Sequence, residues 1–135
     1  MAQIDRTFVG IALVWLILGM VLGLYMGIAA NNQLLVVHVA MLMSGFVVLA
    51  IYGVIYRLWP ALKDSPIAKV QFWIAVIAVL GQVIGAYQFA VSGGTEIMII
   101  ASSSVLAIVA GVLMAWLFWT RSAESASPLP ISRTA

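Results

Sequence analysis

Residues 33–59 read QLLVVHVAMLMSGFVVLAIYGVIYRLW, and this one segment is enough to place the chain in a membrane. A helix needs about 20 predominantly apolar residues to cross the roughly 30 Å hydrocarbon core of a bilayer. Three further segments have the same character, at residues 7–30, 68–91 and 97–120. The sequence therefore predicts an all-α integral membrane protein, a bundle of four transmembrane helices.

The composition agrees with this fold class. The chain has 135 residues, of which 65% are hydrophobic and only 7% are charged, whereas about 25% are charged in a typical soluble domain. We therefore expect membrane lipid to surround it. The chain has no Cys, which excludes disulfides, thiolate metal sites and a cysteine nucleophile. A net charge of +2 without a basic run gives no indication of nucleic-acid binding.

The short polar connections fix the expected orientation. All the basic residues lie before the first span, at or between the facing ends of the second and third spans, or after the fourth span: Arg6, Arg57, Lys63, Lys69, Arg121 and Arg133. Because basic residues favour the cytoplasmic side, both termini are predicted to be cytoplasmic. Residues 1–121 form the predicted membrane domain, and the Ser- and Pro-rich residues 122–135 form a predicted disordered cytoplasmic tail.

His38 is the only histidine of the chain. An ionisable side chain inside a membrane span is costly and is by default a functional candidate. One interpretation is a neutral structural His that hydrogen-bonds to a backbone carbonyl or to a Ser or Gln of a neighbouring helix. The other is an axial ligand to haem iron. A protein-built zinc or copper site needs three or four ligands, whereas a porphyrin supplies four equatorial ligands itself.

Helical spacing predicts that one face carries His38 together with Leu42, Gly45, Leu49, Tyr52 and Tyr56. Gly45 leaves room there for a flat ligand or for another helix. The predicted cofactor-binding residues are His38, Met41, Leu42 and Gly45, with Met98 as a candidate for a second axial ligand. Gly19, Gly23 and Gly27 predict a close-packing face, within or between chains. Gln82, Gln88 and the serines at 102–104 are expected to hydrogen-bond between helices.

Residues 38–60, HVAMLMSGFVVLAIYGVIYRLWP, resemble a helix of subunit I of the haem–copper oxidases and nitric oxide reductases. In that family the helix carries His-x-His, a Gly five residues after the second His, then an aromatic-Gly-x-x-Tyr segment and a Pro. Aligned on Gly45, His38 falls on the first His of the pair, and Ala40 occupies the second His position.

The resemblance implies one of the three four-helix arcs that build subunit I. We expect a homotrimer with twelve helices in the bacterial cytoplasmic (inner) membrane. It implies haem b with its iron on His38, and a role in electron transfer or diatomic gas binding, with a respiratory-chain electron donor as a possible partner. Because Ala40 replaces one His and no copper-binding His set is present, copper and full oxygen reduction are not expected, and the enzyme class stays open.

Two other functions remain open from the sequence. A small four-helix transporter would use His38 as its proton relay, because the predicted spans hold no acidic residue. A cofactor-free accessory subunit of a respiratory complex would leave His38 with a structural role. Three copies of His38 meeting on the trimer axis could also form a metal site.

Overall fold

The computed structural model of the chain describes residues 3–123. Its four long helices are each apolar enough to cross a bilayer, which confirms the predicted all-α membrane fold class. They are α1 (Ile4–Ala29), a second span from Leu35 to Leu58, α4 (Pro66–Val91) and α5 (Met98–Arg121). The predicted tail lies outside the described residues from position 124 onward.

The second span is not a uniform α-helix. It consists of α2 (Leu35–Ala40), the π-helix η1 (Met41–Val48) and α3 (Leu49–Leu58). A short 3-10 helix, η2 (Pro60–Asp64), follows it. Segments of π-helix are rare and are frequently found at functional sites. The π-helix begins three residues after His38 and therefore changes which side chains share a face with it.

Local chemistry explains where α1 ends and where α4 begins. Ala30 takes a left-handed conformation with φ 49°, and its N–H donates to the carbonyl of Met26, which closes α1. Ser65 is the N-cap of α4, because its Oγ accepts a hydrogen bond of 3.3 Å from the N–H of Ile67. Pro66 occupies the first helical position, where a missing N–H costs nothing.

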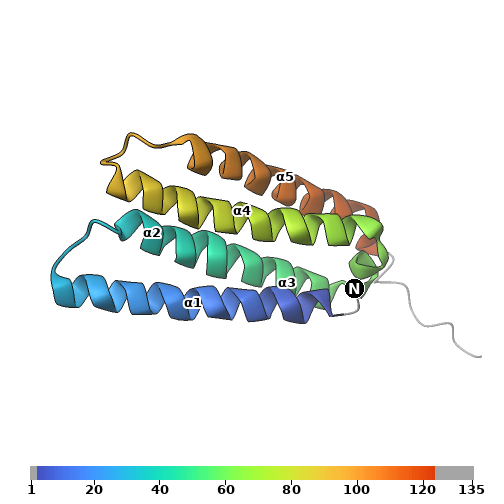
Figure 1. Ribbon diagram of the computed structural model, residues 1–135. Coiled ribbons are helices and arrows are strands. Elements are labelled where there is room, and N and C mark those ends of the chain that lie inside the picture. The colour runs from blue at the N-terminus through green and yellow to red at the C-terminus, as the bar shows by residue number, and fades with distance from the viewer. Residues whose placement is uncertain (1–2, 124–135) are drawn as a thin grey trace, which may run out of the picture.

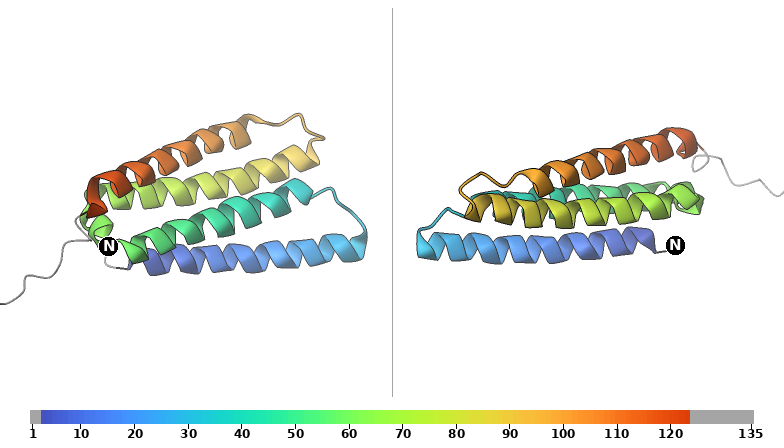
Figure 2. Two further views of the ribbon diagram at one scale, coloured as in Figure 1. Left: turned by 180° about the vertical axis from the view of Figure 1, so that it is seen from behind. Right: turned by 45° about the horizontal axis from the view of Figure 1, so that its top comes forward.

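The helices lie side by side in chain order and form a curved row (Figures 1 and 2). α1 packs on the second span, the second span packs on α4, and α4 packs on α5. α1 and α5 are therefore the two edges of the row. Both edges expose large apolar side chains, such as Ile28 of α1 (79% exposed) and Ile108 of α5 (67% exposed). Exposed apolar surface of this extent needs a cover of lipid or of other chains.

One end of the row carries the start of α1, η2 and the end of α5 (Figure 1), and we call it the basic end. The larger buried cluster lies here and is centred on Phe8. The Phe8 ring centroid lies 4.8 Å from that of Phe72 on α4 and 5.9 Å from that of Tyr56 on α3. Aromatic packing therefore joins α1, α3 and α4 at this end. That the basic end faces the cytoplasm stays a prediction.

Candidate functional site

His38 lies on α2 and faces α1. Its Nδ1 is 2.8 Å from the carbonyl oxygen of Gly19. Because a carbonyl oxygen only accepts, Nδ1 carries the proton and donates this bond. In the neutral tautomer with the proton on Nδ1, the lone pair is on Nε2, which makes no hydrogen bond within residues 3–123. His38 is half-buried, so Nε2 is not sealed inside the chain.

Two glycines of α1 make room for this contact. A Cβ on Gly23 would lie 2.7 Å from Cε1 of His38, and a Cβ on Gly19 would lie 2.6 Å from Cδ2 of Leu42. Real Cβ atoms do not approach other atoms so closely, so only glycine permits this separation of the helices. A Cβ on Gly27 would meet nothing within 4 Å. The predicted close-packing face therefore serves a contact within the chain at Gly19 and Gly23, while Gly27 lies free of it.

The other predicted cofactor-binding residues lie near His38 along the same contact. Leu42 packs on Gly19, with the Cβ of Met41 next to it. Gly45 faces Trp15 of α1, whose Cγ would lie 2.6 Å from an added Cβ. The room that Gly45 provides is therefore filled by an indole of the same chain. The sequence left open whether Gly45 makes room for a flat ligand or for another helix. In the structure it makes room for a side chain of a neighbouring helix.

The predicted shared face holds for Tyr52 and Tyr56 only at Phe8 of α1, whose ring both tyrosines contact. The next residues toward α1 are Gly53, whose added Cβ would meet Val9 at 2.7 Å, and Arg57, which reaches Asp5. Each is one residue later than α-helical spacing predicts. The wider turns of the π-helix at Met41–Val48 account for the shift.

The two tyrosines also make contacts on the α4 side of the second span. Tyr56 is fully buried, and its hydroxyl donates a bond of 3.2 Å to Oε1 of Gln71 on α4. Tyr52 lines a cavity between the second span, α4 and α5. Its ring also packs edge-on against Phe8, at 5.8 Å between centroids.

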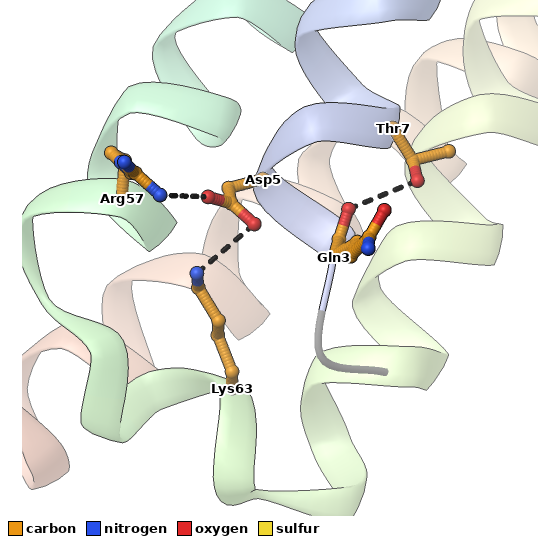
Figure 3. A network of polar contacts seen from close by, with 5 residues as sticks. All are labelled: Gln3, Asp5, Thr7, Arg57 and Lys63. Atoms are coloured by element: carbon orange, nitrogen blue, oxygen red, sulfur yellow. Dashed lines mark hydrogen bonds and ion pairs between the residues drawn. The ribbon is translucent and has the colours of Figure 1, made fainter.

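Sequence reasoning missed a buried acid at the basic end. Asp5 lies in the first turn of α1, because the helix begins at Ile4 rather than at the predicted residue 7. Its carboxylate lies 3.0 Å from Nζ of Lys63 and 3.4 Å from Nη1 of Arg57 (Figure 3). In the same first turn, the Thr7 hydroxyl donates to the carbonyl of Gln3 at 3.0 Å (Figure 3).

This cluster ties three elements together. Asp5 comes from α1, Arg57 from α3 and Lys63 from η2. Only 5% of the Asp5 side chain is exposed, and a buried carboxylate is tolerated when cations pair with it. The statement that the spans hold no acidic residue is therefore wrong, although this acid is held by two cations. Because Arg6 and the polar Thr7 follow Asp5, the sequence reads as a polar segment that precedes the first span.

The serines at 102–104 do not hydrogen-bond between helices as expected. Ser102 donates to the carbonyl of Ile99, and both Ser103 and Ser104 donate to the carbonyl of Ile100. All three bonds lie within their own helix, a common habit of serine in apolar surroundings. Met98, the candidate second axial ligand, begins α5 and is 79% exposed.

Over residues 3–123, no group of three or more His, Cys, Asp or Glu side chains gathers to hold a metal ion. His38 therefore belongs to no such group within the described residues. Comparison of the chain with family models, with curated proteins and with solved structures gives no match.

Proposed function

We propose that this protein binds haem b in the membrane, with Nε2 of His38 as an axial ligand to the iron, for electron transfer or for binding a diatomic gas. The observation that carries the proposal is the 2.8 Å bond from Nδ1 to the carbonyl of Gly19. A metal-ligating histidine almost always donates its other ring N–H to a carbonyl or a carboxylate, which orients the ring and fixes the tautomer. His38 already has that arrangement.

The donor chemistry of the site fits haem better than a bare metal ion. Zinc and copper sites take three or four protein ligands, and the described residues supply one nitrogen with no partner nearby. Haem needs one protein ligand on a face, because the porphyrin fills the equatorial positions. When bound, it supplies one-electron chemistry and a site for a gas at its iron.

The space around His38 limits where the group can lie. Trp15 fills the room at Gly45, and the ring of His38 covers Gly23, so the seam between α1 and α2 has no room for a porphyrin. We therefore place the haem on the half-exposed side of His38, at a surface completed by a second copy of the chain. In this arrangement Leu42 and Gly45 support His38 by fixing α1 against the second span.

The open row of helices supports the proposed homotrimer. Its edge helices α1 and α5 expose apolar side chains, and they could pair edge to edge between copies. A heterologous contact of this kind closes into a ring when the rotation is right. Three rows of four would give twelve helices, the arrangement that the resemblance implies.

Absorption spectra of the purified protein test the proposal. Wild type, His38→Ala and the control Gln88→Leu, which removes an exposed polar side chain from α4, are compared after expression with added haem. We expect a Soret band and b-type reduced bands in wild type and in the control, and their loss in His38→Ala.

Two results would overturn the proposal. One is a colourless wild-type protein, which would leave transport or a cofactor-free subunit role as the functions to test next. The other is an unchanged haem spectrum in His38→Ala, which would place the ligand elsewhere. Light scattering of the detergent-solubilised protein tests the trimer separately. A monomer that retains haem would contradict the homotrimer and the haem surface shared between copies, but not haem binding by His38.

A further inference from the structure

A cavity of about 390 Å³ lies between the second span, α4 and α5. Its volume falls within the range of small-molecule sites, roughly 300–1,000 Å³. Neither His38 nor any residue of α1 is among its lining residues. The proposed haem site does not use it.

Three polar side chains that line the cavity, Gln82, Tyr52 and Ser44, make no hydrogen bond within the described residues. Oε1 of Gln82 is buried and makes no hydrogen bond, and the hydroxyl of Tyr52 makes none within the described residues. In a bilayer no water is at hand to satisfy such groups, and each costs free energy while it stays unpaired. Turning the amide of Gln82 around would put its NH₂ group in the buried place instead. One end of this side chain is unpartnered in either orientation.

The remaining walls define the shape and charge of what fits. Four of the lining residues are alanines, Ala75, Ala78, Ala107 and Ala110, and no charged residue lines the cavity. Small, apolar walls favour a flat and uncharged occupant. Val48 and Ile108 line it as well and are exposed on the apolar surface of the row. A molecule dissolved in the bilayer can therefore reach the cavity from the side.

We propose that this cavity binds an uncharged, bilayer-soluble molecule that carries a hydroxyl group on a flat ring, of the phenol or quinol class. A ring hydroxyl both donates and accepts, so it pairs with the end of the Gln82 amide that lines the cavity in either orientation of that amide. Tyr52 offers a further donor to an oxygen of the same molecule. The apolar ring is held by the alanine walls.

Thymol and p-cymene test the proposal, because they share one carbon skeleton and differ only in the hydroxyl. Binding to the full chain in nanodiscs is measured by equilibrium dialysis, with empty nanodiscs as the baseline. We expect wild type to bind thymol above the baseline and about fivefold more tightly than p-cymene, which is the effect of roughly one net hydrogen bond. Gln82→Leu should lower thymol binding to the level of p-cymene, while the control Gln88→Leu on the exposed face of the same helix should not.

A second pair of variants tests the location. Ala107→Leu fills the cavity and should abolish the binding of both probes, whereas Ala115→Leu lies on an exposed face of α5 and should leave both unchanged. Gln82→Leu removes an unpaired buried polar group and so should fold at least as well as wild type. If Ala107→Leu does not fold, Gln82→Leu and Gln88→Leu still decide the question.

Three results would overturn this inference. Equal affinity for thymol and p-cymene in wild type would make the cavity a site for acyl chains. Binding no greater than the baseline would remove the site altogether. A changed oligomeric state in Ala107→Leu would make the cavity an interface between copies. The haem content of Gln82→Leu should equal that of wild type. Failure of the proposed cavity site can therefore be distinguished from failure of the proposed haem site at His38.

Discussion

A methyl group at Gly23 would press directly on the imidazole of His38. In Gly23→Ala the new Cβ would lie 2.7 Å from Cε1, and ordinary contact begins at 3.4 Å. The ring would have to withdraw by roughly 0.7 Å, which is the difference between these two distances. A movement of that size along the bond would lengthen the 2.8 Å contact to Gly19 beyond the usual range of about 2.7–3.2 Å.

The size of the effect follows by comparison with Gly27→Ala. Both changes gain about 0.5–1 kcal/mol of helix propensity, but an added Cβ at Gly27 would touch nothing within 4 Å. The difference between the two variants therefore isolates the clash. Overpacking costs about 1–3 kcal/mol, and loss of an interhelical polar bond in a membrane adds about 0.6 kcal/mol. We expect Gly23→Ala to be less stable than Gly27→Ala by about 1.5–3.5 kcal/mol, the sum of these two costs.

Unfolding by SDS in mixed micelles, followed by Trp fluorescence, measures this difference. Because His38 is the only histidine, ¹⁵N-labelled histidine gives one ring to observe, and the wild-type spectrum should show the neutral tautomer with the proton on Nδ1. Equal stability of the two variants, or a proton on Nε2 in wild type, would refute the described contact between α1 and α2.

Three further changes test other contacts by the same unfolding assay. Lys63→Met removes the 3.0 Å partner of buried Asp5, and we expect a loss approaching the roughly 3–5 kcal/mol of a broken buried pair, lessened because Arg57 stays at 3.4 Å. The control Lys69→Met, on an exposed side chain, should change stability by about 0.5 kcal/mol or less; similar losses in both would contradict a special role for Lys63. Gly85→Ala would place a Cβ 2.5 Å from the backbone N of Ile100, which cannot rotate away, so we expect a loss of about 3 kcal/mol. Gly10→Ala, with nothing within 4 Å, is its control, and a neutral Gly85→Ala would disprove the close approach of α4 and α5. Tyr56→Phe removes the hydroxyl that bonds buried Gln71, whose Nε2 already lacks a partner; a loss of about 1–3 kcal/mol is expected, and no loss would show that the bond contributes nothing.

The second span shows where sequence reasoning reached its limit. Its length and apolar character predict a helix, and a helix is present from Leu35 to Leu58. The π-helix inside it could not be anticipated, because residues 41–48 read MLMSGFVV and nothing in that run of mostly apolar side chains marks wider turns. The face predicted from a period of 3.6 residues is correct at Leu42 and Gly45, whereas Tyr52 and Tyr56 reach α1 only at Phe8 and also contact the α4 side.

Asp5 shows a different limit. A span assigned from hydropathy starts where the apolar run starts, so the sequence put the helix boundary at residue 7. The structure extends α1 to Ile4 because Arg57 and Lys63, more than 50 residues away in the chain, neutralise the carboxylate. The partners of Asp5 are brought together only by the packing of α1 against α3 and of η2 against α3.

The sequence by itself determined that the chain is a four-span helical membrane protein, and it singled out His38. These properties follow from hydropathy, which is summed along the chain residue by residue and does not depend on which helices meet. The tertiary structure alone decided which ring nitrogen of His38 is free and what fills the room at Gly45. It also decided that Gln82 and Tyr52 line one cavity. Each of these depends on distances of a few ångströms between helices, and no local pattern encodes them.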